Sequence, residues 1–143
     1  ISADEVINTL EKENTLVLAT CADDRVTIRP MSHINFGLNI YFQTGEDYLK
    51  VHQIKENPYV ALYVGTFEIE GKAEVIGHPL AEENKFFIEK YKVRQPKAYE
   101  LYSHTQELVI KVTVGRVRRW QYLEDGKPGV AMGVFNEDAC CGS

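Results

Sequence analysis

Three side chains, Arg29, Thr44 and Lys50, have the chemistry and the spacing to bind a small anion together. Arg29 falls within a predicted strand, Thr44 ends the next strand, and Lys50 follows in the first turns of a predicted helix. A guanidinium, a hydroxyl and an ammonium group beside a helix N-terminus would bind a phosphate monoester well. Each residue also has an ordinary explanation, as a solvated charge, a strand end or a surface lysine. Spacing alone therefore leaves both interpretations open.

The elements that position these residues follow from hydrophobic periodicity and from turn residues. Strand alternation places Arg29 on the same face as Thr27 and Met31. We expect strands at residues 15–20, 26–32, 39–44, 59–65, 67–77 and 108–122, the first two joined by a turn at 22–25. We expect a first helix that starts at a capping box formed by Ser2 and Glu5 and ends near Asn14. A second helix is expected at 46–56, with Leu49, Val51 and Ile54 turned inward. A third is expected at 80–93, and residues 95–105 are irregular or form a second short helix.

The predicted strand at residues 108–122 changes character along its length. Its even positions are apolar as far as Val114 and become basic or aromatic from Arg116 onward. One face of this strand therefore changes from apolar to polar. Gly71, in the preceding predicted strand, marks a candidate bulge or bend.

Six predicted strands with few helices between them favour a mainly β, mostly antiparallel fold over a doubly wound parallel sheet. We expect a β-barrel with a Greek-key-like strand order and a few α-helices. The 143 residues fit a single domain, residues 1–143, that is long enough to bury a sizeable core. The tail after Gly126 is rich in glycine, and we expect it to be loose at its end.

Composition argues against several classes of partner. There are 16 basic and 21 acidic residues, and a net charge of −5 disfavours a nucleic acid backbone as the main ligand. No apolar run approaches the roughly 20 residues of a membrane span. The three cysteines form no CxxC pair, which with no export signal leads us to expect a cytoplasmic protein.

Common catalytic and binding motifs are absent. There is no GxGxxG for a dinucleotide, no GxxxxGK[ST] for a nucleotide phosphate, and no metal-ligand spacing among the four histidines. No residue is a convincing general acid or base, so the catalytic residues are unknown. His33, close after Arg29, is the best candidate to reach the substrate side, although a loop histidine is the simpler explanation. Cys140 and Cys141 belong to a mobile tail or make a redox or metal contact within a dimer.

Four segments in order resemble a known family: Arg29 to Met31, Ile40 to Gly45, Tyr48 to Lys50, and Ile54 to Leu62. They are similar to the pyridoxamine 5′-phosphate oxidase-like family of FMN-binding split barrels, in its general-stress-protein and nitroimidazole-reductase-like branch. The strand around Gly71 and the late Trp120 also resemble that family, so the likeness covers residues 5–122.

The resemblance implies a homodimer with two FMN sites at the subunit interface. In that arrangement Thr44 and Lys50 hold the phosphate, and the strand after Arg29 lies along the flavin. Trp120, with Arg118 beside it, would approach the far end of the site from the second subunit, although core or interface packing explains Trp120 equally well. The implied cofactor-binding residues are Arg29, Pro30, Met31, Ser32, Thr44, Lys50 and Trp120.

Two departures from the family pattern limit what the resemblance implies. The phosphate motif of the family often reads Ser-Arg-Lys, and this chain has Tyr48-Leu49-Lys50, so one cation is missing unless Lys55 supplies it. The family's C-terminal arginine motif for the vitamin B6 substrate is also absent after Trp120. Oxidation of pyridoxamine phosphate is therefore not expected.

Three hypotheses follow. The first is an FMN-dependent oxidoreductase with an unknown small-molecule substrate and electron donor, in which the flavin carries the redox chemistry. The second is a non-catalytic module that binds or senses a flavin, a deazaflavin or haem on the same fold. The third is a structural dimer without a ligand. The short chain favours FMN over FAD, since it offers no obvious extension for an adenylate.

Overall fold

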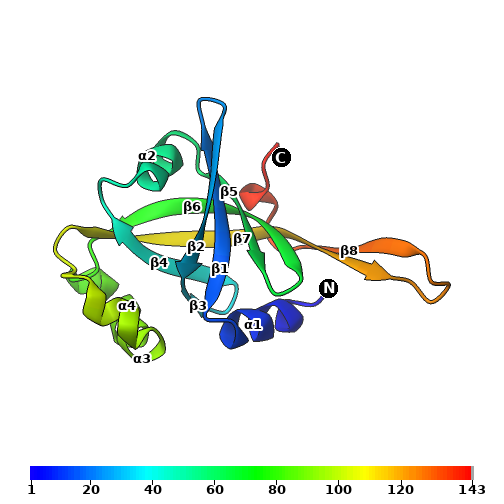
Figure 1. Ribbon diagram of the computed structural model, residues 1–143, viewed down its shortest axis with the longest axis horizontal. Coiled ribbons are helices and arrows are strands. Elements are labelled where there is room, and N and C mark those ends of the chain that lie inside the picture. Colours follow the sequence, from blue (N-terminus) through cyan, green and yellow to red (C-terminus); the bar gives the residue numbers. More distant parts are fainter. Residues whose placement is uncertain (143) are drawn as a thin grey trace.

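The protein, described for residues 1–142 by a computed structural model, folds as one curled antiparallel sheet around a buried core (Figure 1). The eight strands run in the order β2-β1-β5-β6-β7-β4-β3, and β8 pairs with β7. They are β1 (Thr15–Ala22), β2 (Arg25–Ser32), β3 (Ile34–Phe36), β4 (Asn39–Gly45), β5 (Tyr59–Val64), β6 (Phe67–Gly77), β7 (Glu107–Tyr122) and β8 (Pro128–Val134). The helices are α1 (Ala3–Lys12), α2 (Leu49–Glu56), α3 (Lys85–Arg94) and α4 (Pro96–Leu101), with 3-10 turns η1 (Glu82–Asn84) and η2 (Glu137–Ala139). The predicted mainly β, antiparallel fold class is confirmed.

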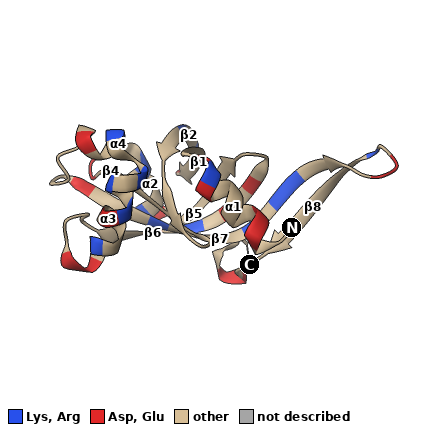
Figure 2. Ribbon diagram, turned by 90° about the horizontal axis from the view of Figure 1, so that it is seen from below, with Lys and Arg blue, Asp and Glu red and all other residues tan. Residues whose placement is uncertain are grey.

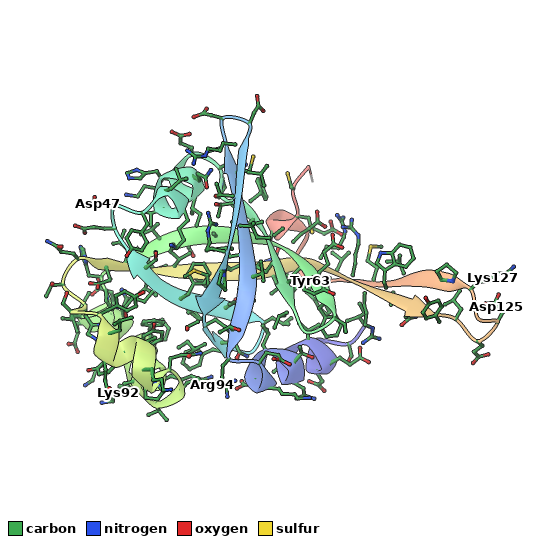
Figure 3. The ribbon with its side chains drawn as sticks, in the orientation of Figure 1. Asp47, Tyr63, Lys92, Arg94, Asp125 and Lys127 are labelled. Carbon is green, nitrogen blue, oxygen red and sulfur yellow. The ribbon has the colours of Figure 1, made fainter. Side chains whose placement is uncertain are left out.

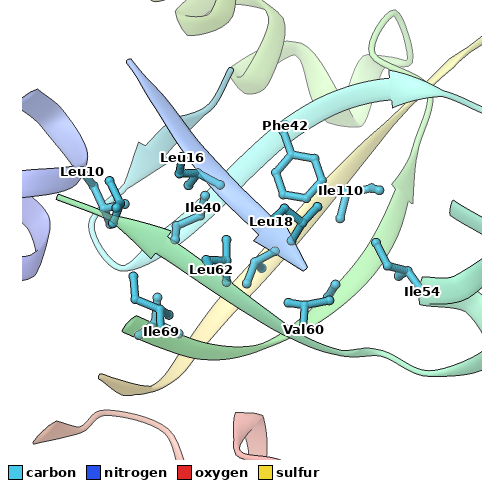
Figure 4. Close-up of a cluster of buried hydrophobic side chains, with 14 of the residues drawn as sticks. Leu10, Leu16, Leu18, Ile40, Phe42, Ile54, Val60, Leu62, Ile69 and Ile110 are labelled. Atoms are coloured by element: carbon cyan, nitrogen blue, oxygen red, sulfur yellow. The ribbon is translucent and has the colours of Figure 1, made fainter. Parts of the chain in front are cut away.

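The main core fills the inside of the curled sheet. Alternate strand residues such as Leu18 and Phe42 point inward and meet apolar residues of α1 and α2, among them Leu10 and Ile54 (Figure 4). Each such side chain contributes about 1.5–3 kcal/mol when it is fully buried. A second cluster around Phe87 and four other residues lies under α3.

The edge strands β2 and β3 end the sheet, and no strand pairing joins them within residues 1–142. Pro30 fits an edge strand because it has no N–H to donate to a further neighbour. Helix α2 follows β4 and packs on β1 beside the β1–β2 hairpin (Figure 1). Residues of β2, of α2 and of the end of β4 are therefore placed around one open end of the sheet.

Several local predictions are confirmed. Ser2 and Glu5 form both hydrogen bonds of a capping box at the start of α1. Asp23 and Asp24 both have positive φ, 51° and 62°, in the two-residue turn between β1 and β2. Helix α2 ends at Glu56, directly before the Asn-Pro pair at residues 57–58.

A register shift explains why the long strand changes face. The partner of Glu70 is Arg116 while the partner of Gly71 is Val114, so β7 carries one extra residue, Gly115. A bulge or bend was expected at Gly71, and the irregularity lies there, but the extra residue belongs to the neighbouring strand. The inward position consequently moves from the even residue Val114 to the odd residue Val117, and both are buried. The basic and aromatic residues that follow at even positions therefore point outward.

Several boundaries differ from the predictions. The sheet also contains two strands that were not expected, β3, which is only three residues long, and β8, whose residues show no clear polar and apolar alternation. Helix α2 begins at Leu49 rather than near Glu46, and Leu49 is exposed instead of turned inward. The helix expected from Leu80 begins at Lys85 after a 3-10 turn. Residues 95–105 contain the short helix α4, which was one of the two alternatives.

The segment after Gly126 forms β8 and η2 over residues 128–139, where no strand or helix was expected. β7 and β8 form a two-stranded ribbon that projects from the body, with Asp125 and Lys127 at its tip (Figure 3). The chain then returns to β7 through η2, where a Cβ on Gly115 would lie 2.7 Å from the carbonyl carbon of Ala139. A glycine at 115 permits this close approach. Among the helices of residues 1–142, none has the length and apolar character to cross a membrane.

Candidate functional site

Arg29 is held at the open end of the sheet by neutral hydrogen-bond acceptors. Its Nη1 donates to the Oγ1 of Thr20 at 2.9 Å and to the carbonyl oxygen of Leu18 at 3.3 Å, and its Nη2 donates to the Oγ1 of Thr27. Burial lowers the pKa of Arg29, but a guanidinium stays charged at any physiological pH. The side chain is therefore a fixed and permanent positive charge.

Lys50 lies close to Arg29 and is nearly buried. Its residue surface is 8% exposed, and its Nζ sits 4.5 Å from the ring centroid of Tyr48. Burial, and secondly the positive charge of Arg29, lower the pKa of Lys50 to about 8. Tyr48 packs over Gly45 as well, where a Cβ would lie 2.8 Å from the Tyr48 ring. The aromatic ring that replaces the family's serine thus helps to hold the lysine.

Neither of these two cations has an acidic partner within residues 1–142. Other basic residues do: Arg116 pairs with Glu70 at 3.0 Å, and Arg118 lies 3.6 Å from both Glu68 and Glu70. Two neighbouring cations repel each other, and the repulsion is poorly screened where one of them is almost buried. A bound anion would offset this repulsion. Arg29 and Lys50 together therefore have the electrostatics of an anion site.

Thr44 provides a buried hydroxyl that has no hydrogen-bond partner within residues 1–142. It comes from the end of β4, and a turn in which Tyr48 N–H donates to the carbonyl of Gly45 leads from it into α2. A buried hydroxyl without a partner is unfavourable by roughly 1–3 kcal/mol. A ligand oxygen that accepts a hydrogen bond from this hydroxyl would remove this penalty.

A cavity of about 340 Å³ lies beside the same strand end. Pro30, Met31 and Ser32 of β2 form one wall, and Gln43 of β4 contributes to the lining. The amide of Gln43 donates to Nδ1 of His104 at 2.8 Å, while its carbonyl oxygen is buried without a partner. The remaining lining residues come from α3, α4 and the residue after α4: Tyr91, Lys97, Ala98, Leu101 and Tyr102.

The other candidate residues lie elsewhere. Trp120 is 71% exposed on the β7–β8 ribbon, and one chain by itself does not bring it to Arg29. His33 is 1% exposed and its Nε2 is hydrogen-bonded to the carbonyl oxygen of Leu10 at 3.1 Å, so a substrate at the surface does not reach it. Burial also lowers the pKa of His33. Lys55 is exposed on a different face of α2 from Lys50, so it does not replace the missing cation. Within residues 1–142, no group of three or more potential metal ligands gathers.

Sequence reasoning missed the residues that hold Arg29 in place. The Oε1 of Gln53 accepts hydrogen bonds from Thr20 at 2.5 Å and from Thr27 at 2.7 Å. One signal was available, because Gln53 follows Lys50 by three positions and two residues with that spacing share a helix face. A glutamine and a lysine on the inward face of a short helix indicate a polar site rather than a core.

The family follows from the sequence as a whole. A sequence profile described as pyridoxamine 5′-phosphate oxidase matches residues 2–121. The chain belongs to this family. No match was found among curated proteins.

Solved structures of the pyridoxamine 5′-phosphate oxidase-like fold are similar at low sequence identity. An FAD-binding protein of Mesorhizobium loti has 16% identity over 82% of this chain and 92% of its own, with a TM-score of 0.69. General Stress Protein 26 of Bacillus anthracis strain Sterne has 20% identity over 92% of this chain and 100% of its own, with a TM-score of 0.65. The haem storage protein HutZ of Vibrio cholerae has 13% identity over 94% of this chain and 95% of its own, also with a TM-score of 0.65. At these identities the comparisons show a shared fold.

Anion binding at this candidate site should respond to pH through Lys50. Its ammonium group, with a pKa of about 8, is mostly protonated at pH 7 and mostly neutral at pH 9. We expect the affinity for a phosphate monoester to fall up to about tenfold per pH unit above pH 8, because binding then requires uptake of a proton. Titrations with FMN between pH 6.5 and 9.5 measure this slope. Lys50→Arg should flatten it, and a wild-type affinity that stays constant across this range would contradict the assignment.

Proposed function

We propose that the chain binds FMN and acts as a flavin-dependent oxidoreductase on a small molecule that the sequence does not identify. The observation that carries this proposal is the cation pair of Arg29 and Lys50, which has no acidic partner within residues 1–142. Thr44 adds an unpartnered buried hydroxyl. A phosphate monoester would match this donor set, since its oxygens can accept hydrogen bonds from a guanidinium, an ammonium and a hydroxyl group, and its negative charge would relieve the repulsion between the two cations.

The cavity beside β2 fits the other part of such a cofactor. A flavin ring needs a flat, partly apolar slot with a few polar groups at its edge, and Met31, Leu101 and Tyr102 supply apolar surface there. The unpartnered Gln43 carbonyl oxygen could accept a hydrogen bond from a ring N–H. When bound, FMN would supply the hydride or electron transfer chemistry. The residues of the chain would bind it, orient it and limit the access of water.

We also propose that two copies form a dimer through the β7–β8 ribbon. One face of the ribbon exposes apolar side chains, and a two-stranded ribbon is marginally stable alone. Figure 2 shows that the ribbon stands away from the body and carries a basic stretch near its base. In a dimer this ribbon can bring Trp120 to the cofactor site of the partner. The exposed apolar residues of that face are Trp120, Tyr122, Val130, Met132 and Val134.

The decisive experiment is flavin binding by the purified protein. We expect a visible flavin spectrum after reconstitution with FMN, and an FMN-dependent rise in melting temperature that follows the free ligand concentration. A well-folded protein that shows neither would contradict the proposal. Reduction of bound FMN by NADH or NADPH separates an oxidoreductase from the alternative of a non-catalytic flavin module, which would bind FMN without being reduced.

Haem and deazaflavin serve as further ligands in the same assay. Saturable binding of haem or of a deazaflavin in preference to FMN would favour the second hypothesis over the first. A cytoplasmic location remains part of our proposal, and fractionation of the host cell tests it.

A further inference from the structure

We propose that Gln53, acting through Thr20 and Thr27, positions Arg29 so that one edge of its guanidinium stays free for a phosphate group. The consequence is specificity, because the site then prefers FMN over riboflavin, which has no phosphate. The inference rests on the proposed function and assigns a positioning role to residues that the four family-like segments do not include. Gln53 is 3% exposed on the inward face of α2, next to β1 and β2.

The direction of each hydrogen bond in this group is determined by its neighbours. The carbonyl of Arg25 can only accept, so the amide N–H of Gln53 must face it, at 3.0 Å. The carbonyl oxygen of Gln53 therefore faces the two threonine hydroxyls, which donate to it at 2.5 and 2.7 Å. Each hydroxyl has one proton, so with both protons on Gln53 the 3.1 Å contact between the two hydroxyl oxygens has no donor. Each hydroxyl then presents its lone pairs to Arg29, which can only donate. The chain of bonds has a single consistent polarity from Arg25 to Arg29.

This arrangement uses three of the five N–H groups of Arg29. Nη1 donates one hydrogen bond to the hydroxyl of Thr20 and one to the carbonyl of Leu18, and Nη2 donates one to the hydroxyl of Thr27. The Nε–H and the second Nη2 N–H are left, and they lie side by side on one edge of the planar group. That edge has the fork geometry that binds two oxygens of a phosphate. The threonines therefore orient the guanidinium for bidentate binding.

The neutrality of Gln53 matters as much as its position. A glutamate could accept the same two hydroxyl bonds, but its carboxylate would oppose the Arg25 carbonyl and partly cancel the charge of Arg29. The ribbon arginine Arg116 shows the contrasting case, since Glu70 neutralises it at 3.0 Å. A glutamine at this position holds the arginine and leaves its full charge for an anion.

Helix α2 links the two cations of the site. Lys50 and Gln53 are three residues apart and both are buried, so one helix face carries both groups. Packing of α2 on β1 places Lys50 near Arg29 and Gln53 against the threonines that hold it. The position of this short helix thus determines the geometry of both cations at once.

The test compares the affinities of the 143-residue chain for FMN and for riboflavin, measured by flavin fluorescence. We expect Gln53→Glu to weaken FMN binding by about 30-fold and Gln53→Leu by about tenfold, because charge-assisted bonds to phosphate are lost. Riboflavin affinity should change less than about twofold, because riboflavin has no phosphate group for Arg29 to bind. A structural defect alone would weaken both ligands equally.

Two further variants complete the design. His52→Glu adds the same charge on the exposed face of α2 and should leave the ratio of the two affinities unchanged. Thr27→Val removes one hydroxyl without changing side-chain size, and it should lower the FMN affinity selectively if the Gln53 variants fail to fold. An unchanged FMN to riboflavin ratio in a folded Gln53→Glu or Thr27→Val protein overturns the inference.

The melting temperature in the presence of inorganic phosphate tests the role of Gln53 independently of FMN binding. If phosphate raises the melting temperature of the wild-type protein but FMN does not bind, the proposed function is wrong. The inference is then supported if Gln53→Glu, or Thr27→Val in its place, abolishes the phosphate effect, and it is overturned if the effect persists. If neither ligand stabilises the wild type, the anion site is absent and both proposals are wrong.

Discussion

Replacing Arg29 by alanine is expected to weaken FMN binding by about 100-fold, the loss of roughly 3 kcal/mol for a bidentate charged contact. Arg29 offers two adjacent free N–H groups and a charge with no acidic partner within residues 1–142. Isothermal titration calorimetry with FMN measures the change in affinity directly. Lys50→Met should act in the same direction with a smaller loss, since an ammonium group makes a single point contact.

The control is Arg25→Ala, in the same strand. The Arg25 side chain is exposed, and only its backbone carbonyl takes part in the network, so this variant should bind FMN as the wild type does. Riboflavin affinity should be nearly the same in all of these proteins. Equal losses in Arg29→Ala and Arg25→Ala, or a parallel loss of riboflavin binding, would show that the phosphate is held elsewhere.

The second large effect is expected at the ribbon. Trp120→Glu should raise the dimer dissociation constant by at least about 100-fold, because a buried interface tryptophan commonly contributes 2 kcal/mol or more and a charge in its place is unfavourable. Trp120 is opposite Val130 on the face that also exposes Met132. Sedimentation velocity across a range of protein concentrations measures the change.

Gln121→Glu is the matched control for Trp120→Glu. Residue 121 is the next residue of β7 and points to the opposite face of the ribbon, so the same new charge should leave the dimer intact. If the cofactor site lies at the interface, FMN affinity should fall together with dimerisation in Trp120→Glu only. A wild-type protein that is monomeric at all concentrations, or equal behaviour of the two variants, would contradict the ribbon interface.

Local features of the fold were predictable because they depend on neighbouring residues. The capping box at Ser2 and Glu5 and the turn at residues 22–25 are read from side chains a few positions apart, and both are present. The register shift near Gly71 was expected at the right residue. The face change of β7 was visible as a pattern, but its cause, an extra residue around Gly115, appeared only once β6 was paired with β7.

The weak points of prediction were segments with little periodicity. β8 alternates glycine or alanine with exposed apolar residues, and neither set resembles a half-buried strand. β8 forms because it pairs with β7, and no local pattern in residues 128–134 predicts that pairing. The exposed Leu49 has a similar origin, because packing of α2 rather than its sequence decides which face is turned inward.

The sequence by itself determined the family and the antiparallel β class, and it singled out the three residues of the proposed anion site. Residues 121–126 do not contain the arginines that the resemblance would require for a vitamin B6 substrate. Only the tertiary structure decided which cations are available: it places Lys50 beside Arg29, and it pairs Arg118 with glutamates. It also brings Gln53 to Thr20 and Thr27 across 33 and 26 residues of chain. Such contacts depend on how the sheet curls and where α2 packs, and no local pattern encodes that geometry.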